Sequence, residues 1–449
     1  MAVDEENSTP VSRMASTDEE KHPHGYDTPD HFAGLSVQTT PPGVPPEEGL
    51  GGWLCVAGSF SALLATFGFL NAMGVFQNTY ATSILRTYTH FDIGWIFAFQ
   101  LAAMWIPGPL FGRIIDSYGP VPVLWPCSIL CVFSLCMTSL SDKYYQIFLS
   151  QGVGFGIGAG GVFTVATVCT GQWFVKRRGL AVGITTAGSS FGGVIFPIFF
   201  YHVQEDVGFH GAVRYTALFI GILLFISCCL IKSRLPKKKW NSKLPWLDVS
   251  LFKNPAFALY TAGSFFVMWG LFGPFDFLLY MGRKRGFSYP MAVYLVSILN
   301  ASSILGRILP PHLGDRYGYF NVQTLVTFLS GLTIAALWIP FNYVWSHAGL
   351  IVFAVAYGFF SGGFIGLLMP CVAKAGTIET LGVRFGTFQP VMGLSTLTGL
   401  PIMGQILNTQ RTTNFIGLQS FAMASILVGS LLTAAATVML RRSRGTPFV

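Results

Sequence analysis

Residues 173–188 read Trp173-Phe174-Val175-Lys176-Arg177-Arg178-Gly179-Leu180-Ala181-Val182-Gly183-Ile184-Thr185-Thr186-Ala187-Gly188. An aromatic pair is followed by three cations and then by an apolar run that contains glycine. Trp lies at the headgroup level of a membrane, and Lys and Arg stay on the cytoplasmic side. We therefore predict that a membrane helix ends here, that a short cytoplasmic loop follows, and that the next helix begins near Gly179.

The composition also indicates a membrane protein. Of 449 residues, 52% are hydrophobic and only 10% are charged, whereas soluble proteins carry about 25% charged residues. Residues 1–51 hold ten acids and two bases (−8), and the rest of the chain holds 25 bases and 9 acids (+16), which together give the net charge of +8. The basic excess therefore belongs to the loops of the membrane part, and we predict no nucleic-acid partner.

Twelve apolar segments follow the acidic start, and each is long enough for the roughly 20 residues that a membrane helix needs. They lack the alternation of barrel strands, so we predict an all-α membrane protein with twelve transmembrane helices in two pseudo-symmetric six-helix bundles. The expected segments are 53–76, 93–115, 121–140, 145–170, 179–200, 212–231, 256–280, 290–311, 321–340, 347–372, 382–405 and 416–440.

The expected domains follow from these segments and from charge. We predict that both termini are cytosolic, because loops on that side would hold seventeen cations against seven on the other. The expected divisions are a disordered acidic tail (1–51), an N-terminal half (52–231), a basic cytosolic linker (232–255), a C-terminal half (256–440) and a cytosolic tail (441–449).

Two acidic loops repeat at equivalent places in the two halves. Gly112-x-x-x-Asp116-x-x-Gly119 follows the second segment, and Pro311-x-x-x-Asp315-Arg316-x-Gly318 follows the eighth, at an offset of 199 residues (315 − 116). Such an offset is typical of a duplicated six-helix unit. An acid at a helix end can meet a helix N-terminus, so we interpret both loops as gates; an ordinary turn with a left-handed glycine is the alternative.

The opening stretch resembles the signature of the monocarboxylate transporter family, a branch of the major facilitator superfamily, and it is most similar to fungal members. The matching residues are Trp173, Phe174, Lys176, Arg177, Gly179, Leu180, Ala181, Gly183, Ala187 and Gly188. Glu48-Gly49-Leu50-Gly51-Gly52-Trp53 resembles the family's entry to the first helix, although Leu50 and extra glycines interrupt it. The resemblance implies transport by alternating access.

Arg307 is the first candidate for substrate binding. An Arg inside a membrane segment indicates a functional site, and its planar fork suits a carboxylate. The resemblance implies the same role, whereas an Arg that reaches the inner interface or braces Asp315 is the alternative. The family's animal members carry an acid where this chain has Ser303 and a Lys where it has Asn71, so their proton relay does not transfer. Structural hydrogen bonds between helices are the alternative for three of the further substrate-site candidates, Asn71, Asn300 and Ser303. The other two are Phe360 and Ser361.

Asp276, in the seventh segment, is the candidate for proton coupling, with an ion pair to Arg283 or Arg285 as the alternative. Other polar or aromatic residues that could line a cavity are Gln100, Gln151, Thr185, Thr186, Ser189, Tyr357 and Gln389, each of which could equally be a packing residue.

No pattern in the sequence indicates an enzyme. All eight Cys fall in apolar runs without a zinc-type spacing, and Gly152, Gly154, Gly156 and Gly158 lie in an apolar segment without a following phosphate-binding Lys. We predict no catalytic residue, no metal and no cofactor, and we attribute the glycines to close helix packing.

The sequence thus predicts a secondary transporter, monomeric as the transport unit, for a monocarboxylate-like organic anion, with a proton as the candidate co-transported ion. The plasma membrane is the expected location. A fungal secondary-metabolite exporter, an importer of a vitamin such as riboflavin, and a transceptor with a signalling role are the alternatives.

Overall fold

The computed structural model describes residues 49–235, 246–343, 346–375, 378–410 and 414–449. Most of the expected acidic tail and the middle of the expected linker lie outside these residues. Within them, eleven helical stretches are long and apolar enough to cross a membrane. They are Leu50–Ile84, Phe91–Tyr118, Val121–Thr138, Tyr144–Trp173, Arg178–Leu230, Pro255–Lys284, Tyr289–Tyr317, Tyr319–Asn342, His347–Ala373, Ile378–Thr409 and Ile416–Ser443.

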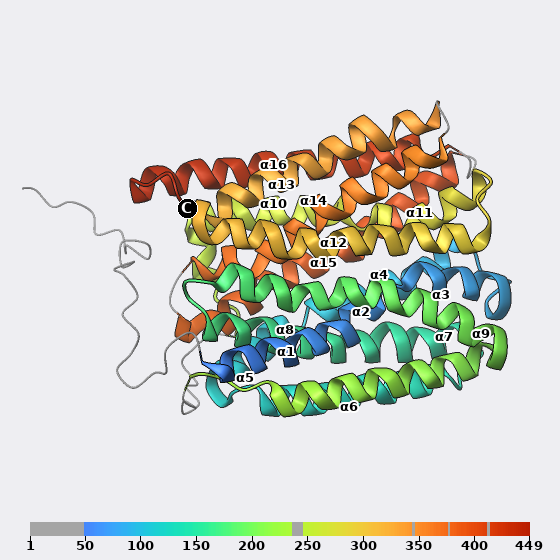
Figure 1. Cartoon of the computed structure of the whole chain (residues 1–449), viewed down its shortest axis with the longest axis horizontal. Coiled ribbons are helices and arrows are strands. Elements are labelled where there is room, and N and C mark those ends of the chain that lie inside the picture. Colours follow the sequence, from blue (N-terminus) through green and yellow to red (C-terminus); the bar gives the residue numbers. More distant parts are fainter. Residues whose placement is uncertain (1–48, 236–245, 344–345, 376–377, 411–413) are drawn as a thin grey trace, which may run out of the picture.

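The fifth stretch, α9 (Arg178–Leu230), accounts for two of the twelve predicted crossings. Its 53 residues would extend about 80 Å at 1.5 Å per residue, far beyond a hydrocarbon core of about 30 Å. The backbone reverses at Gly208, where φ is 72° and ψ is 178°, a conformation that favours glycine. The two limbs of α9 run in opposite directions in Figure 1. The two expected segments, 179–200 and 212–231, lie in the two limbs, and the residues between them are also helical except at Gly208.

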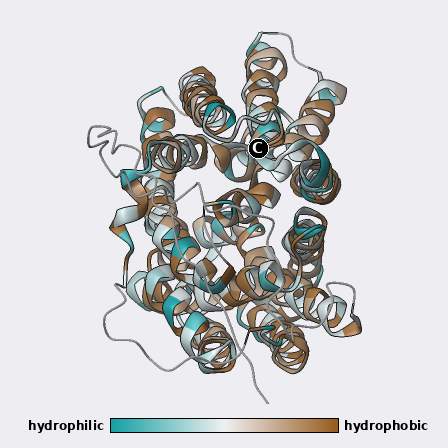
Figure 2. Cartoon of the chain, turned by 90° about the vertical axis from the view of Figure 1, so that its left-hand side faces the viewer, coloured by the Kyte–Doolittle hydropathy of each residue, from teal (hydrophilic) through white to brown (hydrophobic). Residues whose placement is uncertain are grey.

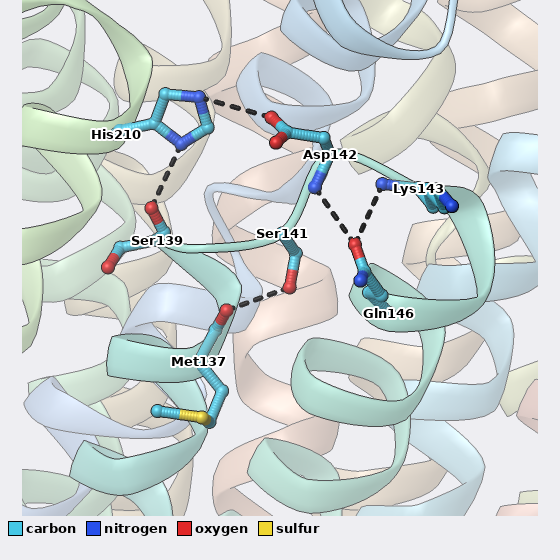
Figure 3. A network of polar contacts seen from close by, with 7 residues as sticks. All are labelled: Met137, Ser139, Ser141, Asp142, Lys143, Gln146 and His210. Atoms are coloured by element: carbon cyan, nitrogen blue, oxygen red, sulfur yellow. Dashed lines mark hydrogen bonds and ion pairs between the residues drawn. The ribbon is translucent and has the colours of Figure 1, made fainter.

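A polar network holds the second limb of α9 next to its reversal (Figure 3). The Nδ1 atom of His210 lies 2.9 Å from the carbonyl oxygen of Ser139, and its Nε2 atom lies 3.4 Å from Oδ1 of Asp142. The backbone N–H groups of Asp142 and Lys143 both donate to Oε1 of Gln146, at 3.1 Å. These contacts fix the loop that follows α6 (Val121–Thr138) against α9.

Two crossings are broken into pieces at related places. The first consists of α1 (Leu50–Ala65), α2 (Phe67–Leu70), α3 (Met73–Thr79) and η1 (Tyr80–Ile84). The seventh consists of α10 (Pro255–Leu271) and α11 (Gly273–Lys284), which Phe272 separates. Broken helices occur at membrane depth only where protein or a water-filled cavity surrounds them, and in transporters they mark binding sites.

The other elements complete two groups of helices. In Figure 1, the elements up to α9 form the lower group and those from α10 onward form the upper group, and α1 begins at the same end of the molecule at which α16 ends. Hydrophobic residues occur on all sides of both groups in Figure 2. The remaining elements are α4 (His90–Trp105), α5 (Gly108–Tyr118), α7 (Tyr144–Ile147), η2 (Phe148–Phe155), α8 (Gly156–Trp173), η3 (Val249–Lys253), α12 (Tyr289–Tyr317), α13 (Tyr319–Thr333), η4 (Ile334–Trp338), η5 (Pro340–Asn342), α14 (His347–Ala373), η6 (Ile378–Thr380), α15 (Leu381–Thr409) and α16 (Ile416–Arg444).

Two helix crossings join the groups. The α9–α12 seam consists of the first limb of α9 packed on α12, and the α5–α15 seam consists of α4 and α5 packed on α15. The described residues therefore form an all-helical membrane protein whose two helix groups meet mainly along two seams. Arg307 lies at the α9–α12 seam.

Candidate functional site

Arg307 lies on α12 and is only 1% exposed. Its Nε atom donates to Oγ of Ser303 at 3.3 Å, one helical turn away. Its Nη1 atom donates to the carbonyl oxygen of Thr186 at 3.0 Å and also to Oγ of Ser189. Arg307 therefore neither reaches the inner interface nor braces Asp315; its guanidinium group crosses the α9–α12 seam.

Several other predicted residues converge on the same place. The Nδ2 atom of Asn71, at the end of α2, donates to the carbonyl oxygen of Ser189 at 3.0 Å. Oγ of Ser190 donates to Oγ of Ser303 at 3.1 Å. Asn71, Ser303 and Arg307 thus belong to one buried network with α9. The sequence analysis missed Ser190, which no feature of the local pattern distinguishes from its serine neighbour.

Asn300 lies two turns before Arg307 on α12. Its Nδ2 atom donates to the carbonyl oxygen of Val296 at 3.0 Å, within its own helix. A Cβ atom on Gly193 of α9 would collide with the Asn300 amide, so this side chain also lies against the seam. For Asn71, the structure shows the alternative interpretation, a hydrogen bond between helices.

Phe360 and Ser361 lie on α14, which packs on α12. Ser361 is buried and its Oγ donates to the carbonyl oxygen of Gly358 at 3.4 Å, while Phe360 packs edge-to-face on Phe359 at 5.4 Å. Within the described residues, no hydrogen bond joins either of them to Arg307. The structure therefore does not bring these two candidates into the polar network.

Aromatic rings cover the other side of the guanidinium group. The Cζ atom of Arg307 lies 5.5 Å from the ring centroid of Phe67, within the range of a cation–π contact. Phe67 in turn contacts Phe163 (5.7 Å), Phe272 (6.4 Å) and Trp105 (6.5 Å). The sequence analysis missed these rings, because an aromatic residue in an apolar segment carries no pattern that separates a site from a core.

Asp276 lies on α11 and does not belong to the hydrogen-bond network of Arg307. It lines a cleft with Gln77, Leu407 and Asn408, where α3, α11 and α15 meet. Both carboxylate oxygens are buried and have no hydrogen-bond partner in the described part of the chain. The cleft lies toward the end of the molecule opposite the termini, since Asn408 is at the end of α15.

The alternative of an ion pair for Asp276 was wrong. Arg283 lies over the ring of Tyr289 at 5.6 Å, and Nη2 of Arg285 donates to Oδ1 of Asn342 at 3.5 Å. Within the described ranges, neither cation forms a salt bridge with Asp276.

Asp315, at the end of α12, accepts hydrogen bonds from the first turn of α9. Its Oδ1 atom accepts from the backbone N–H of Gly179 (2.7 Å) and its Oδ2 atom from that of Leu180 (3.0 Å). The hydroxyl group of Tyr319 also donates to Oδ1, at 2.8 Å. The N-terminus of a helix carries unpaired N–H donors and a partial positive charge, so a carboxylate is stabilised there.

Asp116 makes the equivalent contact in the opposite direction. It lies on α5, and its two carboxylate oxygens accept from the backbone N–H groups of Gly382 (3.0 Å) and Val383 (2.8 Å), at the start of α15. Each group of helices therefore supplies one carboxylate that caps a helix of the other group. We call these four contacts the inner caps.

The glycines of the two acidic loops have separate roles. Gly119 and Gly318 have φ values of 83° and 88°, so the left-handed turn that was the alternative interpretation is present together with the caps. A Cβ atom on Gly112 would collide with the carbonyl oxygen of Gly382, which explains the need for glycine at this crossing. Arg316 is exposed on the surface.

The residues of the opening stretch support the α9 end of these caps. Lys176 and Arg177 are exposed, whereas Arg178 is buried and its Nε atom donates to the carbonyl oxygens of Gly171 and Phe174 at the end of α8. Phe174 packs edge-to-face on Trp53 at 5.2 Å, so the two signature-like stretches contact each other. The apolar run then forms α9, and its residues Ala181, Gly183, Ala187 and Gly188 are buried.

No group of three or more His, Cys, Asp or Glu residues within the described ranges is arranged to hold a metal ion. The site consists of one buried cation, hydroxyl and amide groups, and aromatic rings. Such a set can bind and release an organic solute without changing its covalent structure.

Comparison with known proteins agrees with this arrangement. A family model described as Major Facilitator Superfamily matches residues 55–399. The MFS-type transporter hasB of Aspergillus fumigatus is 41% identical over 409 residues, which cover 88% of this chain and 91% of that protein. The Aspyridones efflux protein apdF of Emericella nidulans is 36% identical over 396 residues, covering 88% of this chain and 79% of that protein.

Among solved structures, the human organic anion transporter MFSD10 superposes with a TM-score of 0.65 at 16% sequence identity, covering 87% of this chain and 99% of that chain. At this identity the likeness concerns the fold alone.

Proposed function

The chain belongs to the Major Facilitator Superfamily, and on that premise we propose that it exports a small organic acid of secondary metabolism by alternating access. It is a multi-pass membrane transporter of a small molecule, in a family of transporters rather than of enzymes. The finer statements below about substrate, direction and residues are our proposal.

The similarity to apdF, a protein named for efflux whose alignment covers 88% of this chain, is the observation that supports export. It favours the exporter that the sequence left as an alternative over uptake of a simple monocarboxylate. The resemblance to monocarboxylate transporters still supports an acidic substrate. Arg307, the buried cation of the seam network, could bind its acidic group. We therefore propose an acidic metabolite and the plasma membrane as its site of export.

We propose that Arg307 binds the acidic group of this metabolite. In the present state its Nη1 atom is held by Thr186 and Ser189 of α9. A carboxylate is a stronger partner for guanidinium than a hydroxyl or a peptide carbonyl, because both partners are then charged. Binding of an acid would thus replace contacts that hold α12 on α9, which couples loading of the site to movement at the seam.

The inner caps would keep the cytosolic end closed in this state. Loading from the cytosol requires them to open, and rocking of one group against the other would break all four contacts. Asp276 is the proposed proton carrier, because its carboxylate lines the cleft at the opposite end. Replacement Asp276→Asn should make export insensitive to an imposed pH gradient, and an unchanged response would contradict this role.

The test of export uses inside-out plasma-membrane vesicles from yeast that expresses the full chain. Their uptake of a panel of radiolabelled conjugated organic acids is compared with that of vesicles from cells without the protein. We expect uptake of at least one acid, lost in Arg307→Gln and retained in Arg283→Gln, a matched change outside the seam network. No uptake of any acid, or lactate uptake in right-side-out vesicles only, would contradict the proposal.

A further inference from the structure

Three buried polar atoms close to Arg307 have no hydrogen-bond partner in the described part of the chain. They are Nε1 of Trp105, Oδ1 of Asn71 and Oδ1 of Asn300. Trp105 and Asn300 are fully buried, and Asn71 is 3% exposed. Buried polar atoms in proteins are nearly always hydrogen-bonded, so each exception needs an explanation. Three exceptions around one cation indicate a site that is completed by a ligand.

The amide orientations fix what these atoms can offer. The Nδ2 atoms of Asn71 and Asn300 both face backbone carbonyl oxygens, of Ser189 and Val296. A carbonyl oxygen only accepts, so the NH2 group must be on that side and Oδ1 must be the atom left over. Oδ1 of Asn300 lies against Gly193 of α9, so the site offers Oδ1 of Asn71 as its acceptor and the indole N–H of Trp105 as its donor.

The rings near these atoms come from both groups of helices. Phe67 of α2, Trp105 of α4 and Phe163 of α8 contact one another at 4.9–6.5 Å. From the other group, Phe272 lies 6.4 Å from Phe67 and Phe385 of α15 lies 6.2 Å from Phe163. We call these five residues the ring cluster. A small aliphatic acid could use Arg307 but would have no use for five rings, whereas a flat conjugated body stacks on them or meets their edges.

Resting on the proposed function, we infer that the substrate is a flat, conjugated organic acid that also carries a hydroxyl or N–H donor. Arg307 binds the acidic group, and the ring cluster contacts the conjugated body. The indole N–H of Trp105 donates to an oxygen on that body, and Oδ1 of Asn71 accepts from its donor. Because ring cluster and polar atoms belong to both groups of helices, such a ligand contacts both halves of the transporter at once.

The experiment measures equilibrium binding to the purified full-length chain in detergent by calorimetry, so its result does not depend on the direction of transport. The probes are 6-hydroxy-2-naphthoate, 2-naphthoate, which lacks the hydroxyl donor, and lactate, which lacks the rings. From the stacking contacts we expect 6-hydroxy-2-naphthoate to bind at least about tenfold more tightly than lactate. From the added hydrogen bond we expect 2-naphthoate to bind about two- to tenfold more weakly than its hydroxylated analogue.

Variants assign the effect to the site. Trp105→Phe keeps a ring but removes the N–H, and should weaken binding of both naphthoates by about two- to tenfold. The matched control is Trp338→Phe: Trp338 is equally buried but stacks on Phe353 at 5.2 Å, and its Nε1 atom donates to Sδ of Met281. This control should leave binding unchanged, and thermal unfolding of each variant reports whether it is folded.

Equal affinity for lactate and the naphthoates would overturn the inference, as would binding of no probe at all. Equal effects of Trp105→Phe and Trp338→Phe would also overturn it. Tight binding of the naphthoates together with absent vesicle uptake would instead reject the proposed export and leave the assigned ligand class standing.

Discussion

At the α9–α12 seam, a Cβ atom on Gly183 would lie 2.5 Å from the carbonyl oxygen of Arg307; at the α5–α15 seam, a Cβ atom on Gly386 would lie 2.5 Å from that of Gly108. The two carbonyl residues are separated by 199 positions (307 − 108), the same offset as the capping acids (315 − 116). The crossings are therefore copies of each other in backbone and caps, but one copy carries a guanidinium group where the other has only a hydrogen atom.

The residues that face these positions differ accordingly. Thr186 receives Arg307 through its carbonyl oxygen, whereas Gln389, at the corresponding place on α15, packs on Gly108 and exchanges hydrogen bonds with Thr164 of α8 at 3.0–3.1 Å. Both seams close the molecule, but at the position where the α9–α12 seam has Arg307, the α5–α15 seam has Gly108. Both seams therefore share the closure, whereas the guanidinium group that we propose for recognition of a charged ligand comes from one half alone.

The largest effect should come from removing that charge. Arg307→Ala should lower the initial transport rate on the order of 100-fold, because truncation of a buried charged hydrogen-bonding group costs roughly 2–5 kcal/mol. Gln389→Ala, the change at the corresponding place of the α5–α15 seam, should lower it by no more than about tenfold. Rates are measured in vesicles and divided by the amount of inserted protein. Equal losses in the two variants would show that the charge makes no difference between the seams.

The next effect concerns the inner caps. Asp315→Asn and Asp116→Asn should each favour the open inner end by about tenfold or more, since hydrogen bonds to charged groups contribute roughly 1.5–3 kcal/mol. Amide hydrogen exchange at residues 179–180 and 382–383 measures this directly. If the groups rock as rigid bodies, either variant should speed exchange at both pairs. Faster exchange only at the pair that lost its carboxylate would show that the seams open independently.

A smaller effect should come from removing the Tyr319 hydroxyl group, a hydrogen-bond donor that the α5–α15 seam lacks at the equivalent position. Tyr319 donates to Asp315, and the residue 199 positions earlier is Pro120, which has no hydroxyl group. Tyr319→Phe should cost about 0.5–1.5 kcal/mol and raise exchange at Gly179 and Leu180 by about two- to tenfold. Tyr260→Phe, which removes another buried hydroxyl in the same group of helices, is the control and should leave this exchange unchanged.

The smallest effect should come from the end of the linker. The Cζ atom of Arg113 on α5 lies 4.3 Å from the ring centroid of Trp246, and the backbone N–H of Asp248 donates to Oγ1 of Thr387 on α15 at 3.0 Å. Trp246→Ala should therefore loosen the α5–α15 seam by about 0.5–1 kcal/mol, about two- to fivefold in exchange at residues 382–383. An equal or larger change at residues 179–180 would contradict this assignment to one seam.

The sequence was informative where polar residues interrupt an apolar background. Arg307 was predicted on that basis, and Asn71 and Ser303 because they occupy positions of relay residues in the family that the chain resembles. The structure joins all three in one network. The number of crossings followed from segment length, but the helical connection around Gly208 did not, because polar residues such as Glu205 and Asp206 are typical of loops and of exposed helix alike.

Other parts of the site could not be predicted from the sequence. The partners of Asp116 and Asp315 are backbone N–H groups, which every residue except proline has, so no side-chain pattern identifies them. Phe67 and Trp105 are apolar residues among 52% hydrophobic residues, and only their three-dimensional grouping distinguishes them. Asp276 was predicted from its charge, but its lack of a partner could be seen only in the structure.

The inner caps have a consequence for genetics. Their four donors are main-chain atoms, so no missense mutation to a residue other than proline removes one of them, and on the acceptor side only two codons, those of Asp116 and Asp315, are exposed to change. A selection for variants with a leaky cytosolic end should therefore return few classes of allele: replacements of the two acids, prolines at the starts of α9 and α15, and larger residues at Gly179 or Gly382. If the selection returns only these classes of allele, it would show that backbone N–H groups hold the cytosolic end closed.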